Sequence, residues 1–562
     1  MLPNTVSAYS EYAAKEFLQT VVFVDDRIYN RKHGAVAKPQ PVLAPKKRKK
    51  AVKSADKDVL EKTVASVSND GGTDDYSPHD IVTSFAKKQI ICSLYQPQKN
   101  AKVSAASDIF PLCLASDIVI LDWDLYGDKG QKAVELVDGL IQQSVQDVPE
   151  QLRLILVYTQ EQNLFDIANQ LYEKINGSLG DNIEPLQEEG GLAFHTLNSR
   201  VSVLGKTGRA RIEEYRSHEV EEKDLADRAV KEFSKLASGL LHAATLLGLA
   251  EIKKNSRKIL SKFNSSLDPA FLTHRAMSLP DEDAANHLIP LLISEIEAVL
   301  EDSLPKPLVS EALIKDWCQT EWNPGIHVTR LLGDKVGPRE LAVDFCLKGK
   351  NMRDKHKEVS LITQSITKKG DWNSSERSKI RDISSILLEK EDSTSNHEFS
   401  RLMSSRTFYD ERKKDLKLGT IVCMECEEDN KYMLCLQPIC DSVRITNPRK
   451  FLFTELEAVK QDRKNKASHV LILANNEKKE LLYQPKSFKC YVSEFLPEAR
   501  SKQVLAEHAD DNQQIFEDTT GCKYIWIDQL KPAHAQRAAE KYARELSRVG
   551  LTESEWQRLL DT

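Results

Sequence analysis

The sequence has few of the features that mark secreted or membrane proteins. Its ten cysteines are scattered over 562 residues, which is typical of reduced thiols rather than of a disulfide framework. The longest uncharged stretch in the predicted helical middle, residues 236–250, is too short to span a bilayer. The N-terminus has neither a basic start nor an apolar core, so we expect no secretory signal and a cytoplasmic protein that does not enter a membrane.

The sequence also lacks an excess of charge of one sign. It contains 79 basic and 85 acidic residues, for a net charge of −6, which argues against a nucleic acid as a partner. A chain of 562 residues is too long for a single hydrophobic core, and three domains is a reasonable expectation.

Two short apolar runs end in aspartate. Residues 21–24 are followed by Asp25 and Asp26, and residues 118–121 are followed by Asp122. Continuous runs rich in β-branched residues are typical of strands buried on both faces of a parallel sheet. The carboxyl ends of such strands share one edge, where ligands bind, so we expect the three carboxylates to converge there. Mutual repulsion would then favour a bound cation.

Further apolar runs alternate with helical patterns and predict one α/β domain. We expect strands at residues 89–95, 152–159 and 201–206, and helices at about 5–19, 80–88, 131–143 and 163–175. This alternation is typical of a doubly wound parallel sheet with right-handed crossovers. A polar segment at about 31–78, with a basic cluster at residues 46–50, has the composition of a disordered insertion.

The rest of the chain predicts two further regions. Apolar residues at helical spacing from about 221 to 263, with helices near 281–300 and 309–317, indicate a helical section over 216–325. After residue 325 the pattern changes to an α+β domain over 326–562, with a hairpin at 419–438. We expect its other strands at 451–454, 469–474, 488–492 and 524–527, a helix at 533–549, and a capping box at Thr552 and Glu555.

Polar residues end two more of the predicted strands. Thr159 ends the run at 152–159, and Lys206 ends the run at 201–206. With Asp25, Asp26 and Asp122, these residues make residues 1–215 resemble the receiver domain of two-component response regulators. That family accepts a phosphoryl group on one aspartate in a Mg²⁺-dependent reaction.

The resemblance implies a role for each residue. Asp122 would be the phosphoacceptor, since a carboxylate can form an acyl phosphate. Thr159 and Lys206 would contact the phosphoryl oxygens. Asp26 and Asp122 would ligate Mg²⁺, Asp25 would act through water, and the main-chain carbonyl of Asp124 would complete the ligand set.

The sequence departs from the family at three places. Tyr126 stands where the family usually has proline, and Val203 stands where the family has the aromatic residue of its output switch. The interval between Asp26 and Asp122 is about twice what one helix, two strands and their connections require. The polar segment at about 31–78 accounts for the excess.

Four cysteines, Cys423, Cys426, Cys435 and Cys440, have spacings that superficially resemble a zinc site. Cys423 and Cys435 lie in strand-like runs, where cysteine packs as a small apolar residue. The sequence leaves zinc binding by this set open.

The resulting hypothesis is a bacterial response-regulator-like protein that accepts a phosphoryl group on Asp122 from a sensor histidine kinase. It is a phosphoacceptor rather than a turnover enzyme, and other receiver proteins or a second copy of the chain are further candidate partners. With its polar insertion at about 31–78 and its long C-terminal extension, the chain also resembles receiver proteins of Detocs-type defence operons, which implies a phosphate sink. Two alternatives stay open: a receiver-gated effector enzyme with its active site in the C-terminal domain, and a non-enzymatic scaffold.

Overall fold

The structure of the chain is a computed structural model. It describes residues 2–28, 77–99, 108–146, 151–179, 190–196, 198–208, 211–277, 288–322, 394–409, 412–425, 430–459, 469–472, 478–509 and 513–547, with a few isolated positions between 339 and 387. The polar segment predicted to be disordered lies outside the described residues except for its last two positions, and the predicted capping box near the C-terminus lies entirely outside them. The chain forms two compact units, residues 1–274 with 286–321, and residues 275–285 with 322–562.

The first unit is built on a mostly parallel sheet. Its strands are β1 (Thr20–Val24), β2 (Ile91–Tyr95), β3 (Ile118–Leu121), β4 (Arg153–Thr159), β5 (Ala193–His195), β6 (Ser199–Lys206) and β7 (Glu219–Val220). The order is β2-β1-β3-β4-β6-β5, and β7 pairs with the end of β6. All pairs are parallel except β5 with β6. The predicted doubly wound parallel sheet is confirmed, with one short antiparallel strand added at its edge.

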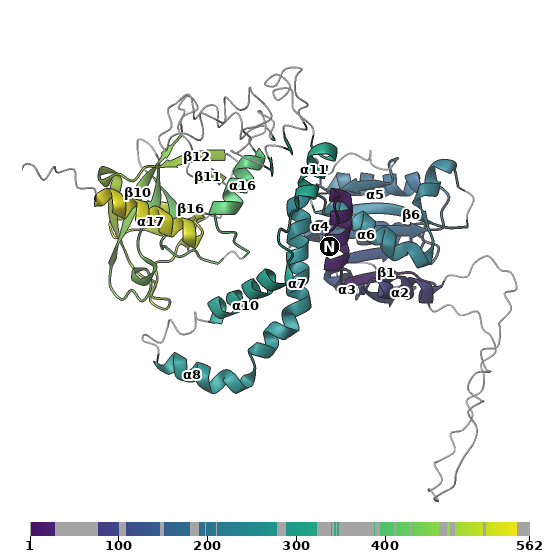
Figure 1. Ribbon diagram of the computed structural model, residues 1–562, viewed down its shortest axis with the longest axis horizontal. Helices are drawn as coiled ribbons and strands as arrows, with labels where there is room; N and C mark the ends of the chain where they lie inside the picture. Colours follow the sequence, from purple (N-terminus) through teal and green to yellow (C-terminus); the bar gives the residue numbers. More distant parts are fainter. Residues whose placement is uncertain are drawn as a thin grey trace, which may run out of the picture. The chain divides into compact units, whose positions relative to one another are not determined.

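Helices cover both faces of this sheet (Figure 1). Helices α1 (Val6–Phe17), α2 (Pro78–Lys87), α6 (Leu225–Leu236) and α7 (Leu240–Lys262) contribute to one core, and α3 (Ile109–Ala115), α4 (Gln131–Gln146) and α5 (Leu164–Leu179) contribute to the other. Alternate residues of β1 divide between these cores, Val21 and Phe23 in the first, Val22 and Val24 in the second. Burial on both faces explains why the strands are continuous apolar runs.

Helix starts in this unit follow simple capping chemistry. The Thr5 hydroxyl accepts a hydrogen bond from the Ala8 N–H at the start of α1, and the Ser77 hydroxyl accepts one from Asp80 N–H at the start of α2. Proline at position 78 suits the first turn of α2, because its missing N–H has no helical partner there. Helix α3 was not predicted from the sequence, since its seven residues are too few to show a helical period.

The helical section consists of several separate helices. The periodic stretch from 221 to 263 forms α6 and α7, which are separated at Gly239, whose φ of 105° lies outside helical values. They are followed by α8 (Asp268–Met277), α10 (Leu288–Ser303) and α11 (Glu311–Thr320). No helix among the described residues is long and apolar enough to cross a bilayer.

The second unit contains an antiparallel sheet. Its strands are β8 (Thr420–Met424), β9 (Lys431–Cys435), β10 (Arg449–Ala458), β11 (His469–Ile472), β12 (Lys478–Tyr483), β13 (Cys490–Phe495), β14 (Glu507–His508), β15 (Gln514–Glu517) and β16 (Lys523–Gln529), and its helices include α16 (Thr394–Ser404) and α17 (Pro532–Leu546). The order is β11-β12-β10-β9-β8-β16-β15-β14. The predicted hairpin is the pair β8 and β9.

Part of this second sheet closes on itself. Strand β13 pairs with β10 on one side, and on the other Phe495 bridges to Asp518 while the Thr519 N–H donates to the Glu494 carbonyl at 2.8 Å. The resulting barrel encloses a core rich in aromatic rings, including Phe453, Phe495 and Tyr524. A second core lies under α17, on the other face of the sheet.

The cysteines of the hairpin belong to different cores. Cys423 on β8 packs in the core under α17, whereas Cys435 on β9 packs inside the barrel. Cys440 is exposed, and Cys426 lies outside the described residues. Because Cys423 and Cys435 point to opposite faces of the sheet, these two side chains do not share one metal ion.

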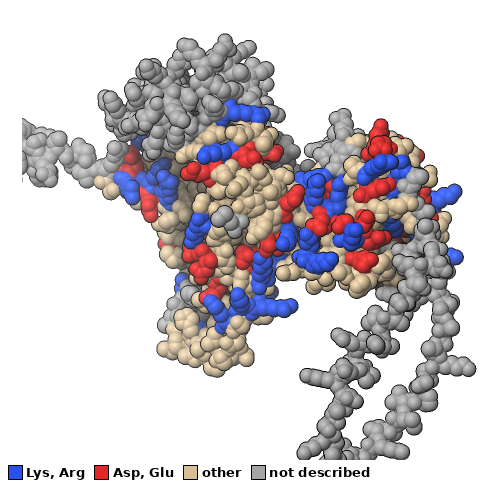
Figure 2. Space-filling view, turned by 45° about the vertical axis from the view of Figure 1, so that its right-hand side comes forward, with Lys and Arg blue, Asp and Glu red and all other residues tan. Residues whose placement is uncertain are grey.

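Lysine and arginine side chains alternate with aspartate and glutamate on the face of the described residues seen in Figure 2. This face therefore offers no single continuous basic area within the described part of the chain.

Candidate functional site

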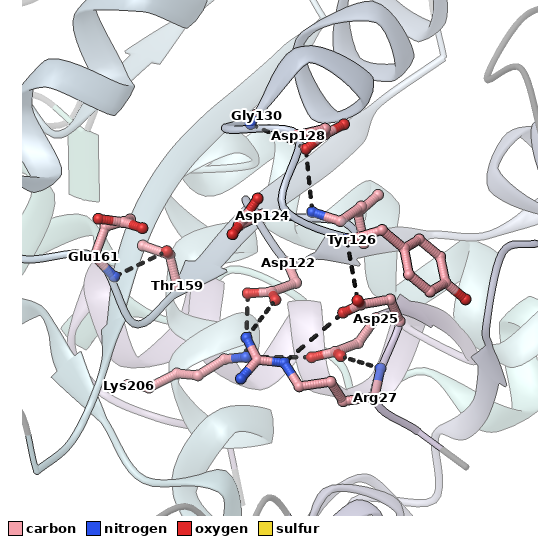
Figure 3. A network of polar contacts seen from close by, with 12 residues as sticks. Asp25, Arg27, Asp122, Asp124, Tyr126, Asp128, Gly130, Thr159, Glu161 and Lys206 are labelled. Carbon is pink, nitrogen blue, oxygen red and sulfur yellow. Dashed lines mark hydrogen bonds and ion pairs between the residues drawn. The ribbon is translucent and has the colours of Figure 1, made fainter. Parts of the chain in front are cut away.

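Three carboxylates gather at one edge of the parallel sheet, and Figure 3 labels two of them, Asp25 and Asp122. Asp25 and Asp26 follow β1, and Asp122 follows β3, its direct neighbour in the sheet. All three residues are buried, and one oxygen from each lies within 4.8 Å of the others. The structure thus brings together the acidic residues that the sequence placed at this edge.

Lys206 reaches the same cluster from the end of β6. Its Nζ lies 3.2 Å from Asp25 Oδ2 and 3.1 Å from Asp122 Oδ1. Lys206 is itself buried, so these two ion pairs are shielded from solvent. The predicted convergence of Lys206 on the acidic residues is present in the structure.

Arg27 also belongs to the cluster, although the sequence analysis did not single it out. Its main-chain N–H donates to Asp25 Oδ1 at 2.8 Å. Its guanidinium lies 3.4 Å from Asp122 Oδ2 and 3.8 Å from Asp26 Oδ1, with 40% of the side chain exposed. The position of Arg27 directly after the two aspartates could have suggested that it belongs to the site. The sequence alone did not indicate that its side chain would point toward the carboxylates.

The positive charges of Lys206 and Arg27 offset only part of the cost of burying the carboxylates. Burial raises the pKa of Asp122 to about 6, and the charge of Asp25 adds to this, while Lys206 acts in the opposite direction. Burial also raises the pKa of Asp26, against the effect of the hydrogen bond from Tyr126 N–H. Burial alone would lower the pKa of Arg27, but the neighbouring carboxylates raise it overall.

The donor set fits a small divalent cation. Asp26 Oδ1 is buried and accepts no hydrogen bond, and carboxylate oxygens are the ligands that Mg²⁺ prefers. The acidic triad of Asp25, Asp26 and Asp122 is the one group of this kind found among the described residues.

The loop after Asp122 is held by its own hydrogen bonds. Asp128 accepts from the N–H groups of Leu125, Gly130 and Lys132 at 2.9–3.2 Å, which fixes the start of α4. Gly130 has a φ of 89°, and a Cβ there would overlap the Trp123 ring.

Tyr126 adopts a conformation that proline cannot. Its φ is 63°, whereas proline is restricted to about −65°. In this conformation the Tyr126 N–H donates to Asp26 Oδ2 at 3.0 Å, and its hydroxyl donates to the Pro97 carbonyl at 2.6 Å. Asp124 lies in the same loop, where its side chain accepts a hydrogen bond from Lys129 N–H at 2.9 Å.

Thr159 ends β4 at the same edge and is buried. Its Oγ1 accepts a hydrogen bond from Glu161 N–H at 3.1 Å, which leaves the hydroxyl hydrogen for another acceptor. Val203, on β6, is buried in the core beneath α5 and α4.

Arg211 joins the ends of three strands and was missed by the sequence analysis. Its guanidinium donates to the carbonyls of Thr159 at 3.0 Å and Lys206 at 2.6 Å, and pairs with Glu219 of β7 at 3.0 Å. Its Nε donates to the Glu161 carbonyl at 2.9 Å. Arg211 lies in a connection with no hydrophobic period, so its sequence position carries no signal of these contacts.

Comparison with protein families gives one match. The model of the response receiver domain family matches residues 17–211, whereas comparisons with curated proteins and with solved structures find no match. The matched range contains the three carboxylates, Thr159 and Lys206, and it ends at Arg211. Residues 17–211 of this chain are therefore a response receiver domain.

Proposed function

We propose that this chain is a signalling protein whose receiver domain accepts a phosphoryl group on Asp122 from a sensor histidine kinase in the cytoplasm. The observation that carries the proposal is the position of Lys206 Nζ, within 3.2 Å of both Asp25 and Asp122. A lysine and a buried carboxylate at this distance are arranged to stabilise negative charge as it develops on a transferred group.

The transfer requires one bond to break and one to form. An Asp122 carboxylate oxygen attacks phosphorus, the phosphorus–nitrogen bond of a kinase phosphohistidine breaks, and the electron pair returns to the imidazole. The product is an acyl phosphate on Asp122. With a pKa of about 6, Asp122 is largely ionised at pH 7 and can act as the nucleophile.

The surrounding residues stabilise charge rather than form bonds. Lys206 would pair with one phosphoryl oxygen, and the Thr159 hydroxyl would donate to another. Mg²⁺ held by Asp26, Asp122 and the Asp124 carbonyl, with Asp25 acting through water, would neutralise charge on the phosphoryl group.

We further propose that the protein acts as a phosphate sink. The family's output switch uses an aromatic residue at the position of Val203, which here is a small side chain buried in the core. This favours a role in which phosphoryl groups are accepted and held, as a sink in a defence system requires, over a role that depends on the usual aromatic rotation.

Phosphoryl labelling of the purified full chain tests the proposal. With Mg²⁺ and acetyl phosphate or a histidine kinase, we expect one phosphoryl group per chain by intact-mass spectrometry. The label should be absent in Asp122→Asn and retained in Asp166→Asn, which alters an exposed aspartate on α5. No labelling of the wild-type chain by either donor, or full labelling of Asp122→Asn, would overturn the proposal.

A further inference from the structure

The Arg27 guanidinium lies against one oxygen of Asp122 and one oxygen of Asp26, and the Asp26 oxygen accepts no hydrogen bond. Asp122 Oδ1 contacts Lys206, and Asp26 Oδ2 accepts from Tyr126 N–H. The remaining oxygens, Asp122 Oδ2 and Asp26 Oδ1, are the two that the Arg27 guanidinium approaches, at 3.4 and 3.8 Å.

A divalent ion would need these same oxygens. Mg²⁺ binds oxygen at about 2.0–2.1 Å and demands near-octahedral geometry, so it cannot share them with a guanidinium in its present position. Asp25 is less available as a direct ligand, since one of its oxygens accepts from Arg27 N–H and the other pairs with Lys206.

We propose that Arg27 is a tethered cation that occupies the divalent-ion position when no ion is bound and leaves it when an ion enters. This inference rests on the proposed function, because that function assigns a role to the divalent ion. The inference itself is that Arg27 regulates binding of the ion. Its chemistry is the exchange of one cation for another at the same two carboxylates.

The contacts of Arg27 suit reversible displacement. The contact with Asp122 is a single long hydrogen bond, not the bidentate pairing that makes arginine–carboxylate contacts strong. With 40% of its side chain exposed, the guanidinium can move into solvent without being buried elsewhere. The main-chain hydrogen bond to Asp25 can persist while the side chain moves, so the backbone of the site does not have to change.

A tethered cation and a fixed structural clamp predict different responses to Mg²⁺. If Arg27 leaves when the ion binds, its removal lowers stability only in the metal-free protein. If Arg27 is a fixed clamp, its removal lowers stability with and without the ion. This contrast does not depend on phosphoryl transfer.

The test uses the full chain after treatment with a chelator, and compares wild type with Arg27→Gln. We expect Arg27→Gln to bind Mg²⁺ with a Kd about 3- to 10-fold lower by isothermal titration calorimetry, because the competing cation is gone. Its Tm should lie below that of wild type without metal and equal it at saturating Mg²⁺.

Lys132→Gln is the matched control. It removes the same charge near the site, but Lys132 donates to the Lys99 carbonyl rather than to a carboxylate of the cluster. We expect less than a 2-fold change in the Mg²⁺ affinity of Lys132→Gln. Arg27→Lys keeps a tethered positive charge, so its Mg²⁺ affinity should resemble that of wild type.

Three outcomes would overturn the inference: an unchanged or weaker Mg²⁺ affinity in Arg27→Gln, an equal gain in Lys132→Gln, or a Tm deficit that persists at saturating Mg²⁺. Labelling of Asp122 in the wild-type chain is measured separately. If labelling is intact and any of these outcomes occurs, only the role of Arg27 fails and the proposed function stands.

Discussion

The two sheets of this chain place their buried polar groups differently. In the first unit, the parallel strands β1, β3 and β6 end at one edge, and the buried side chains that follow or end them meet there. In the second unit, neighbouring strands run antiparallel, so that equivalent ends alternate between edges. The buried Asp528 there accepts hydrogen bonds from the Ser405 hydroxyl at 2.7 Å and from the Gln529 N–H at 2.8 Å.

This difference follows from topology rather than composition. In the parallel sheet, burial raises the pKa of Asp26 and Asp122, and the charge of the adjacent Asp25 adds to this effect. Burial also raises the pKa of Asp528 in the second unit, but the causes of that shift include no neighbouring carboxylate. The barrel of the second unit is instead filled by aromatic rings, with Phe453 stacked on Tyr524 and Phe495 packed edge-on against it. Buried charge should therefore matter more for the first unit than for the second.

We expect the largest loss of stability from substitution of Glu232 on α6. Its carboxylate pairs with the fully buried Arg200 of β6 at 2.9 Å and with Arg228 and Lys235 at 2.9 Å. Glu232→Ala leaves Arg200 buried without this charge partner, so we expect a loss of about 3–5 kcal/mol in the stability of the first unit. Hydrogen exchange measured by peptide should show faster exchange in β6 and α6, with β8 to β10 unchanged.

Glu213→Ala is the control for this change. Glu213 forms an exposed ion pair with Arg216, and its loss should cost less than about 1 kcal/mol. Equal effects of the two substitutions, or a matching loss of protection in the second unit, would contradict the contrast between the units.

We expect the next largest effect in the pH dependence of stability, which we compare for one aspartate in each unit. In the metal-free protein the pKa of Asp122 is about 6, above its ordinary 3.8, so folding takes up a proton between these values. The stability of wild type relative to Asp122→Asn should fall as pH rises from about 4 to about 6 and stay level above that, with a total loss on the order of 3 kcal/mol. Urea unfolding at several pH values, with chelator present, measures this difference.

Asp518 in the second unit should behave with the opposite sign. Burial acts to raise its pKa, but hydrogen bonds from Thr520 and Cys522 lower it overall. Its contribution is therefore present above the ordinary value of 3.8 and lost on acidification, so the advantage of wild type over Asp518→Asn should shrink at low pH. The same sign for both aspartates would contradict the dominant role of these hydrogen bonds at Asp518.

We expect the smallest loss of stability from substitution of Gly205. A Cβ at this position would lie 2.8 Å from the Arg211 guanidinium, which is buried and fixed by the carbonyls it contacts. Gly205→Ala should cost about 1 kcal/mol in the first unit and slow the labelling of Asp122. Gly177→Ala on α5, where a Cβ meets nothing within 4 Å, should leave both unchanged, and a similar effect of the two changes would argue against a role for Arg211.

The sequence predicted the parts of this molecule that depend on local pattern. Asp25, Asp26, Asp122, Thr159 and Lys206 each follow or end an apolar run, and the geometry of a parallel sheet then determines that they meet. The same reasoning located most strands of both sheets. It also predicted the doubly wound arrangement, because strands alternated with helical periods.

The sequence did not predict features that depend on distant contacts. Arg27 and Arg211 take their positions from partners up to 95 residues away, such as Asp122 for Arg27. The first half of strand β12 is charged and only its last three residues are apolar, so its pairing with β10 and β11 was not evident from the local pattern. Closure of the barrel depends on one bridge, Phe495 to Asp518, that no local pattern encodes.

Arg211 links the ends of β4 and β6 to the segment that leads into α6. A phosphoryl group that drew the Thr159 hydroxyl and the Lys206 ammonium inward would move two strand ends whose carbonyls hold the same guanidinium. That guanidinium is also paired with Glu219, six residues before the start of α6. Any shift at the acceptor would thus reach the helix that carries Glu232 through one side chain, without requiring an aromatic ring to turn.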